Sequence, residues 1–428
     1  MENISYSKAI PVRYEADVMV AGSGMAGIAA ALGAAMEGMD VIIVERFGVL
    51  GGNATAGGVA NFCGNNVGQG SVLDMVMAAL EEFDAIAPRK KGRGGRVFDH
   101  EILAVILPEL LERYKVKVLL HTTISDVVLN GRRIEAAIVT GPSGLEAIKA
   151  KQFIDCTGEG ALARSAGFSV MKGGSSKYQL PMSLMYFVRH VEEKDVKYIP
   201  EGWFEKIDSE DKLPMTSIWP NGPRSNAIKI KVPMYDSTDT VSMTMAEING
   251  RRKMMSVLDY HQRQEKRSWI LDHCSTVIGI REGVRIVGDY ILTVDDLRNC
   301  KRFEDVIAVG TYYLDGHKPD DDKRTYILPK ESLKVPPYDI PLRCLIAKDG
   351  DNLMMAGRCL SADQLALSSA RVMTTCSMTG QAAGITAALA VKMNTDVRGV
   401  PYAEVQKKMI EAGAILDRDE VASFYEAE

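Results

Sequence analysis

The sequence lacks a strong excess of either charge and lacks any long apolar run. Its 428 residues carry 51 basic and 56 acidic side chains, a formal net charge of −5, which gives no indication of a nucleic-acid partner. No apolar run reaches the ~18 residues of a membrane-spanning helix, and residues 1–16 lack the apolar core of a secretion signal. We therefore expect a cytoplasmic protein that binds neither membrane nor nucleic acid. The basic, Gly-rich run 89–96 is expected to be a surface loop, the alternative being a clamp for an anionic substrate.

Cysteine is also sparse, and no two cysteines form a C-x-x-C pair. Their odd number and wide scatter argue against a disulfide framework, a zinc site or a dithiol reductase. The seven are Cys63, Cys156, Cys274, Cys300, Cys344, Cys359 and Cys376. Most are expected to be small buried hydrophobic residues. Cys63 and Cys376 stand in Gly-rich segments that should lie near a cofactor, and the sequence leaves their roles open.

One stretch, Asp17–Glu45, organises the rest of the chain. The short run Val18–Ala21 is apolar and rich in β-branched residues, which predicts a buried parallel strand. An Ala-rich helix follows from Ile28 to about Glu37, and Val41–Val44 is a second buried strand. This order predicts the first βαβ unit of a Rossmann-like sheet.

Three glycines connect the first strand to the helix at G-x-G-x-x-G spacing. Gly22 permits the tight turn, Gly24 lets a pyrophosphate approach the backbone, and Gly27 lets helix and strand pack closely. The free N–H groups of the helix start can bind the phosphate. Glu45 can accept hydrogen bonds from both ribose hydroxyls and would repel a 2′-phosphate. The alternative is a Gly-rich turn in an ordinary βαβ unit. The predicted binding residues here are Gly22, Gly24, Met25, Ala26, Gly27, Glu45 and Arg46.

The remaining chain reads as two flanking halves around an insert. Gly48–Gly70 is too rich in glycine for a regular element and suggests backbone laid against a large flat group, the alternative being a flexible linker. Helices are expected at 72–86 and 100–113, with a kink or break at Pro108. The expected strands of a β-meander and its continuation are 116–121, 124–129, 133–140, 145–151 and 152–156.

The character of the sequence changes between about Ala166 and Pro337, where Gly-rich turns thin out. Strands are expected at 182–188, 228–232 and 241–245, and a long charged helix at 247–269. A strand is expected at 352–356 and a helix of small residues at 377–391. Their composition resembles that of the strand and helix at the start of the chain. We predict an α/β protein with a discontinuous nucleotide-binding domain, residues 1–165 and 338–428, and an inserted α+β substrate or cap domain, residues 166–337.

The motifs resemble those of FAD-dependent oxidoreductases of the glutathione-reductase-like superfamily, in particular a large bacterial group. The resemblance covers nearly the whole chain and is most specific in its last motif. It is carried by VMVAGSGMAGIAAALGAAMEGMDVIIVE from Val18, LGGNATAGGVANFCG from Leu50, FDHE from Phe98, IDCTGEGALARSAG from Ile154, GIREGVRIVGDYILTVDD from Gly279, GTYYLDGH from Gly310 and PLRCLIAKDGDNLMMAGRCLSADQLALSSARVMTTCSMTGQAAG from Pro341.

The resemblance implies FAD as the bound dinucleotide. The helix beginning near Ser377 would direct its N-terminus at the flavin, where free N–H groups stabilise negative charge on the reduced ring. Because no histidine stands in residues 51–70, we expect the FAD to be non-covalent. The further cofactor-binding residues that the resemblance implies are Gly51, Gly52, Asn53, Thr157, Gly158, Gly357, Arg358, Thr379 and Gly380.

Two clusters in the insert are candidates for substrate chemistry. Arg281 and Arg285 would share one face if helical, as an anion or hydroxyl clamp or as a surface ion-pair array with Glu282 and Asp289. Tyr312, Asp315 and His317 form the second cluster, in which His317 and Asp315 could exchange a proton with substrate or form a structural turn. The family pattern often has proline at Tyr313 and isoleucine at Gly316, so the local pocket is expected to differ. Arg343 and Arg371 are further candidates.

The sequence has no second G-x-G-x-x-G, so no dedicated NAD(P)H domain is expected. We predict an FAD enzyme that transfers hydride between flavin N5 and a small polar molecule, oxidising a C–OH or C–C bond. One alternative is a reductase of activated alkenes in which Arg281 or Arg285 delivers the proton or binds a carboxylate. Another is an FAD-carrying subunit that passes electrons to a partner protein. The sequence leaves open the substrate, the direction of transfer, the electron donor or acceptor and the oligomeric state, a homo-oligomer being possible.

Overall fold

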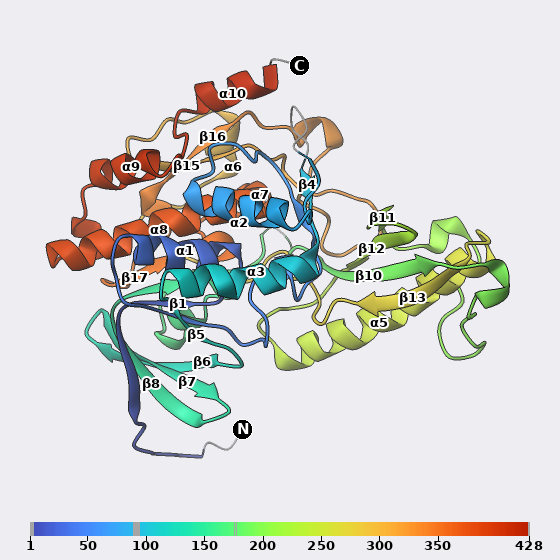
Figure 1. The fold of residues 1–428 in the computed structure, drawn as a ribbon, viewed down its shortest axis with the longest axis horizontal. Helices are drawn as coiled ribbons and strands as arrows, with labels where there is room; N and C mark the ends of the chain where they lie inside the picture. Colours follow the sequence, from blue (N-terminus) through green and yellow to red (C-terminus); the bar gives the residue numbers. More distant parts are fainter. Residues whose placement is uncertain (1–3, 89–94, 175, 177, 427–428) are drawn as a thin grey trace.

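The structure of the chain, a computed structural model, describes residues 4–88, 95–174, 176 and 178–426. It is a mixed α/β protein with a seven-stranded and a four-stranded sheet (Figure 1), which confirms the predicted class. Most of the basic run 89–96 lies outside the described residues, so its two interpretations stay predictions. Within the described part of the chain, no helix combines the length and apolarity needed to cross a membrane.

The seven-stranded sheet is built around the opening strand. Its order is β5-β2-β1-β8-β7-β6, and β17 also pairs with β8. The pairs β5–β2, β2–β1, β1–β8 and β8–β17 are parallel, whereas β6, β7 and β8 form the antiparallel meander. The bounds are β1 Val12–Ala21, β2 Val41–Val44, β5 Lys117–Leu119, β6 Thr123–Asn130, β7 Arg133–Gly141, β8 Gly144–Asp155 and β17 Leu353–Met355. The carboxyl ends of β1, β2 and β8 therefore meet at one edge.

Two helices from opposite ends of the chain cover this sheet. They are α1 (Met25–Met36) and α8 (Met373–Met393), which lie side by side (Figure 1). Glycines at the contact let the backbones approach: a Cβ at Gly380 would lie 2.1 Å from Ala26 O, and one at Gly384 would lie 2.1 Å from Ala30 O. The Ala- and Gly-rich sequences of both helices thus explain their close packing.

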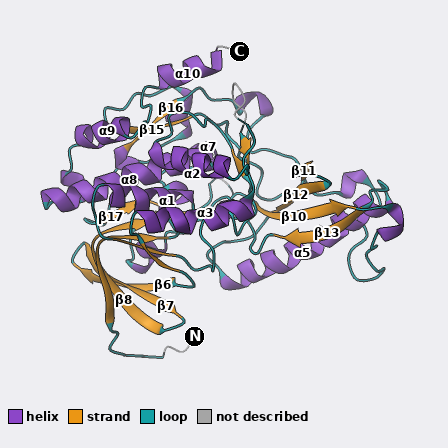
Figure 2. Cartoon of the chain, viewed as in Figure 1, coloured by secondary structure: helices purple, strands orange, loops and turns teal. Residues whose placement is uncertain are grey.

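The four-stranded sheet, order β11-β12-β10-β13, lies apart from the large sheet, together with helix α5 (Figure 2). Its antiparallel strands are β10 Met182–His190, β11 Thr216–Pro220, β12 Ser225–Val232 and β13 Trp269–Cys274, and α5 spans Thr240–Arg263. One face packs on α5 through Ile228 and Ile230, both fully buried. The other face carries Met185, Phe187 and Ala227, which pack with Val59 of the Gly-rich segment.

The other elements connect these two sheets. The helices are α2 Ser71–Glu82, α3 His100–Arg113, α4 Ala161–Ser165, α6 Val294–Arg298, α7 Gln364–Ala370, α9 Tyr402–Glu411 and α10 Arg418–Glu426. The short strands are β3 Asn61–Phe62, β4 Arg96–Val97, β9 Val170–Met171, β14 Arg285–Ile286, β15 Val306–Gly310 and β16 Tyr338–Pro341. The division into 1–165 with 338–428 and 166–337 stays a prediction. Leu292, Ile307 and Ile340 all belong to the hydrophobic cluster that also holds α1 and α8.

Several predicted elements are wrong in detail. The expected strand 241–245 lies inside α5, which begins at Thr240 because Asp239 caps it by accepting from Ser242 N. The helix expected to reach 269 ends at Arg263, and Trp269 begins β13 instead. Helix α3 continues through Pro108, so the expected break is wrong, and the alternative of a kink stays a prediction. The expected strands 145–151 and 152–156 are the single strand β8, which pairs with β7 first and with β17 later.

Candidate functional site

One cavity of about 480 Å³ extends from the carboxyl ends of the parallel strands to the four-stranded sheet. Residues 22–26 line it at one end, and Lys229 of β12 lines it at the other. The two predicted groups of site residues, in the βαβ unit and around His317, therefore border the same space. Its two ends are called the nucleotide end and the Asp315 end below.

The nucleotide end begins at the turn between β1 and α1. Gly22 has φ +87°, in the region that favours glycine, and a side chain at Gly24 would meet open space. No side chain caps α1, no acidic residue lies in its first turn, and its first helical bond runs from Ile28 N to Gly24 O at 3.0 Å. The N–H groups of residues 25–27 are thus free of helical partners. Gly27 lies outside the cavity lining, where a Cβ would come 1.8 Å from Gly22 O.

Glu45, at the end of β2, lines the cavity although its side chain is largely buried. Its carboxylate accepts from Ser23 N at 2.9 Å, from Ser23 Oγ at 2.7 Å and from Phe47 N at 3.0 Å. These donors hold the carboxylate in a fixed orientation. The neighbouring Arg46 forms a bidentate ion pair with Glu159, at 3.0 and 3.1 Å, at the rim of the same end.

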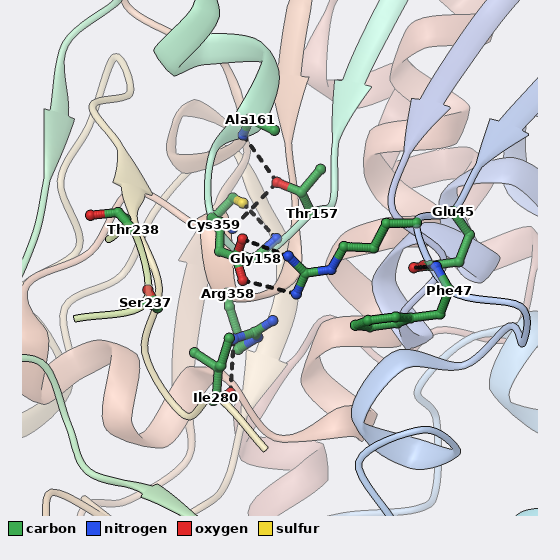
Figure 3. Close-up of polar contacts among 12 residues, drawn as sticks. Glu45, Phe47, Thr157, Gly158, Ala161, Ser237, Thr238, Ile280, Arg358 and Cys359 are labelled. Atoms are coloured by element: carbon green, nitrogen blue, oxygen red, sulfur yellow. Dashed lines mark hydrogen bonds and ion pairs between the residues drawn. The ribbon is translucent and has the colours of Figure 1, made fainter. Parts of the chain in front are cut away.

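Arg358 lines the nucleotide end, and its side chain lies beside Ile280 (Figure 3). Its Nη1 donates to Ile280 O at 2.8 Å, and Asn53 Nδ2 donates to the same oxygen at 3.0 Å. A Cβ at Gly158 would come 2.2 Å from Arg358 Nη2, so only glycine leaves room for this arginine. Burial lowers the pKa of Arg358, which Glu159 partly offsets. Thr157 lines the cavity beside it.

Of the remaining predicted cofactor-binding residues, three line the cavity and two lie behind its wall. Gly51, Gly52 and Gly357 line the cavity. Thr379 and Gly380 lie outside the lining: Thr379 Oγ1 accepts from Gly357 N at 3.4 Å, and Gly380 packs on α1. Their placement inside α8 gives them a supporting position behind the cavity wall.

Helix α8 begins at Met373, not at Ser377. No side chain caps this end, and Val372, Met373 and Cys376 line the cavity. The start of α8 therefore faces the cavity, as the sequence predicts for a helix N-terminus near the cofactor.

Asp315 is the centre of the other end. Its carboxylate accepts from Arg281 Nη1 at 3.1 Å, Arg371 Nη2 at 3.1 Å and Tyr313 OH at 3.3 Å, and its Oδ1 lies 3.1 Å from His317 Nε2. Burial alone would raise the pKa of Asp315, but Arg281, His317 and Arg371 together hold it well below its usual range. Asp315 is therefore a carboxylate that organises its neighbours, not a proton donor.

His317 is buried behind Asp315 and also lines the cavity. Its Nδ1 lies 3.2 Å from Thr325 O, and its ring stacks on Tyr326. Burial lowers the pKa of His317, although Asp315 acts in the opposite direction. Both ring nitrogens face acceptors, so the neutral ring makes one of the two bonds and the protonated ring makes both. Its predicted role in proton exchange stays a prediction.

The two arginines predicted to share a helical face are separated. The segment around them is not helical, and Arg285 begins β14. Arg281 lines the cavity, where its Nε donates to Ser183 Oγ at 3.0 Å, whereas Arg285 lies outside the lining and donates to Gly173 O. The predicted surface array is also wrong, because Glu282 is fully buried and pairs with Arg285 at 3.4 Å.

Tyr312 lines the cavity beside Tyr313, with ring centroids 4.5 Å apart. Burial raises the pKa of Tyr312 and of the nearby Cys63, so both groups stay protonated at neutral pH. The further candidates differ: Arg371 lines the cavity, but Arg343 is outside it and pairs with Asp305 at 3.0 Å.

Sequence reasoning missed Lys229, which lines the Asp315 end. The alternation A-I-K-I-K-V from Ala227 to Val232 predicts a strand with its lysines on the face opposite Ile228 and Ile230. Lysines on such a face are usually solvated. Only the packing of the four-stranded sheet against the rest of the chain shows that Lys229 borders a cavity.

Among the described residues, one group has side chains arranged for a metal: His100, Glu101 and His273, whose ligand atoms lie within 4.8 Å of one another. These residues lie outside the lining of the cavity. The imidazoles of His100 and His273 both stack on Phe187, at centroid distances of 4.9 and 4.3 Å. This packing gives the cluster a structural explanation without an ion.

Residues 17–409 match the protein family described as FAD dependent oxidoreductase. A search of curated proteins finds no match. The family description agrees with the uncapped start of α1, the open side of Gly24 and the carboxylate at the end of β2, which together suit a dinucleotide.

Solved structures similar to this chain include a geranylgeranyl bacteriochlorophyll reductase-like protein from Thermoplasma acidophilum. It is 14% identical with a TM-score of 0.50, over 96% of this chain and 90% of the other. The anhydrotetracycline hydroxylase OxyS from Streptomyces rimosus is 11% identical with a TM-score of 0.48, over 96% and 67%. The myxobacterial chondrochloren halogenase CndH is 13% identical with a TM-score of 0.47, over 97% and 82%. At these identities the likeness concerns the fold alone, and only the first is close enough to support it.

Proposed function

The chain belongs to the FAD dependent oxidoreductase family and is an FAD enzyme, and from this premise we propose that it oxidises or reduces a small polar organic molecule at a C–OH or C–C bond. The observation that carries the proposal is the continuity of the cavity. Residues suited to a dinucleotide and a buried polar cluster that includes Asp315 and His317 border the same space.

The residues at the nucleotide end fit FAD without a covalent link. The free N–H groups of residues 25–27 would bind the pyrophosphate. Glu45 would accept hydrogen bonds from the ribose hydroxyls through the carboxylate lone pairs that Ser23 and Phe47 do not use. Arg358 would add a positive charge to this end. When bound, FAD supplies hydride or electron transfer through its N5. The electron donor or acceptor that completes the cycle is left open.

Proton exchange is assigned to His317 with Asp315. The neutral imidazole makes one of its two hydrogen bonds, and uptake of a proton lets it donate to both Asp315 Oδ1 and Thr325 O. Because burial lowers the pKa of His317, the ring is neutral at rest and can accept a proton, which both hydrogen bonds then hold. Asp315 stays ionised beside Arg281 and stabilises the protonated histidine without accepting the proton itself.

The two tyrosines would complete the substrate pocket. Tyr312 and Tyr313 stay protonated because burial raises the pKa of each phenol. The Tyr312 hydroxyl can donate to an oxygen of the substrate, whereas the Tyr313 hydroxyl donates to Asp315. Both rings exclude water from the Asp315 end.

The proposal is tested by half-reactions of the FAD-loaded protein without oxygen. Oxidised protein would be mixed with a panel of small alcohols and hydroxy acids, and photoreduced protein with the corresponding carbonyl compounds, while flavin absorbance is followed. We expect at least one pair to change the flavin redox state in wild type and His317→Ala to slow that step at least tenfold with FAD retained. His190→Ala, on β10 outside the cavity, is the matched control and should react at the wild-type rate.

Reduction of an activated alkene is the second candidate function, favoured by the position of Arg281 in the cavity wall. Reoxidation of the photoreduced protein by activated alkenes and not by carbonyl compounds would select it. If no small molecule in either panel changes the redox state of the flavin, both enzymatic proposals are contradicted. That result would favour an FAD-carrying subunit that passes electrons to a partner protein.

A further inference from the structure

Lys229 is a half-buried cation that no part of the proposed mechanism uses. It lies on β12 between Ile228 and Ile230, whose side chains pack on α5 on the other face of the sheet. Its own side chain lies on the opposite face and lines the Asp315 end of the cavity. Within the described part of the chain, neither a hydrogen bond nor an ion pair reaches its ammonium group.

Asp315, the carboxylate that acts on Lys229, already accepts hydrogen bonds from other side chains. Asp315 attracts Lys229 electrostatically, but its oxygens accept from Arg281, Arg371 and Tyr313. Burial lowers the pKa of Lys229 to about 8, with Arg281 acting in the same direction, so most of the group is charged at neutral pH. A half-buried ammonium that lines a cavity and has no protein partner among the described residues is free to bind an anion that enters the cavity.

A second cation stands next to Lys229. Ser217 of β11 is the cross-strand partner of Lys229 in the antiparallel register, so their side chains share a face. Arg324 Nη2 donates to Ser217 Oγ at 3.2 Å and to Thr216 O at 2.9 Å, which anchors the guanidinium there. Arg324 lines the cavity and is exposed, so it stands where a ligand would enter.

The charges at the Asp315 end do not balance. The cavity lining there holds four cationic side chains, of Lys229, Arg281, Arg324 and Arg371, against the single carboxylate of Asp315. Arg281 and Arg371 are committed to that carboxylate. The charge of a dinucleotide is met at the other end by the start of α1 and Arg358. Lys229 and Arg324 are therefore left to meet another anion.

We infer that Lys229 and Arg324 form a subsite for a carboxylate group of the substrate, so that the enzyme acts on a small carboxylic acid. This inference rests on the proposed function, whose polar substrate it narrows to an anionic one. A carboxylate offers two oxygens, which match one ammonium and one anchored guanidinium. Arg324 at the entrance would attract the anion, and Lys229 would bind it inside.

Benzoate and benzamide test the subsite, because they share shape and differ in charge. Each would be titrated into the FAD-loaded full chain, with binding followed by the perturbation of flavin absorbance. We expect benzoate to bind at least tenfold more tightly than benzamide. Lys229→Met should remove most of this preference, and Lys229→Arg should keep it. Lys253→Met, on α5 at the opposite face of the sheet, is the matched control and should keep the wild-type preference.

A second measurement needs no variant. Benzoate affinity of the wild type should fall as pH rises through about 8, because the pKa of Lys229 lies there. The charged and titratable groups that act on Lys229 are Arg281, Asp315, Cys63, Arg324 and His317, and the lowered pKa of His317 keeps its ring neutral in this range. Asp315 and the arginines keep their charge over this range, and the raised pKa of Cys63 keeps its thiol neutral. Benzamide affinity should not change with pH.

Three results would overturn the subsite: equal affinity for benzoate and benzamide, including no binding of either; an unchanged preference in Lys229→Met; or a shift of the flavin reduction potential in Lys229→Met with the preference intact. The last would mean that Lys229 serves the cofactor. The proposed function fails separately. If benzoate binds as expected but no small molecule changes the flavin redox state, the subsite stands and the enzymatic proposal falls.

Discussion

The two ends of the cavity are built in different ways. The nucleotide end is built around the βαβ unit, whose residues 22–26 and 44–46 line it with backbone N–H groups and glycines, and residues 51–54, 156–159 and 357–358 complete it. The Asp315 end is assembled from side chains on segments far apart in the sequence, including Lys229, Arg281 and Arg371. The first depends on the path of the backbone, and the second depends on which charges meet after folding. The two ends should therefore fail under different substitutions.

The largest effect is expected where the backbone has no room. Gly22→Ala places a Cβ 2.7 Å from Cys156 O at a φ of +87°, so the turn or β8 must move. We expect loss of FAD binding and a fall of about 3 kcal/mol or more in the free energy of unfolding. Gly38→Ala is the matched control: its φ is +84° and the space around it is open, so it should cost only about 1 kcal/mol and keep FAD. Equal losses in denaturant unfolding would contradict this account.

At the other end, Asp315→Asn removes the charge that Arg281 and Arg371 share. We expect a loss of about 3 kcal/mol in stability, because two buried guanidinium groups lose their partner, and retained FAD binding. Asp305→Asn, which breaks the pair with Arg343 outside the cavity, should leave the half-reaction rates unchanged.

The pH dependence of stability in Asp315→Asn shows over which pH range the charge of Asp315 stabilises the fold. The pKa of Asp315 is lowered in the folded protein, so its contribution to stability is present above the unfolded-state pKa of about 3.9 and is lost as pH falls through the folded pKa. The stability difference between wild type and Asp315→Asn should be constant from pH 7 to 5 and shrink only in stronger acid. A difference that already shrinks between pH 7 and 5 would show that Asp315 is not held ionised.

A smaller effect is expected at Glu45. Glu45→Gln directs an amide at the donors of Ser23 and Phe47, so one hydrogen bond is lost and FAD loses an acceptor. We expect the dissociation constant of FAD, measured by fluorescence quenching, to rise about tenfold with little change in flavin half-reactions. A variant that binds FAD like wild type would remove Glu45 from the site.

The smallest effect is expected at the rim. Glu159→Gln breaks the bidentate pair with Arg46, but 40% of the Arg46 side chain is exposed, so solvent already screens the pair. FAD affinity should change less than fivefold in the same titration. A larger loss would place this ion pair within the binding site itself.

The sequence predicts the nucleotide end better than the Asp315 end. The βαβ unit is recognised because its strand, turn and helix are local, and G-x-G-x-x-G fixes their geometry within a few residues. Errors occur where local patterns compete: Val241–Met245 looks like a strand, but the Asp239 cap and packing on the sheet make it helical. Arg281 and Arg285 look paired by spacing, yet an irregular backbone sends them to different partners.

By itself the sequence determined that the chain binds a dinucleotide and which residues form its βαβ unit, because those features depend on short-range backbone geometry. Only the tertiary structure decided that Lys229, Arg281, Asp315, His317 and Arg371 border one cavity. The reason is physical: charges that cannot be buried alone are brought together by the packing of β12, the segment after β15 and the loop before α8, and no local pattern encodes that meeting.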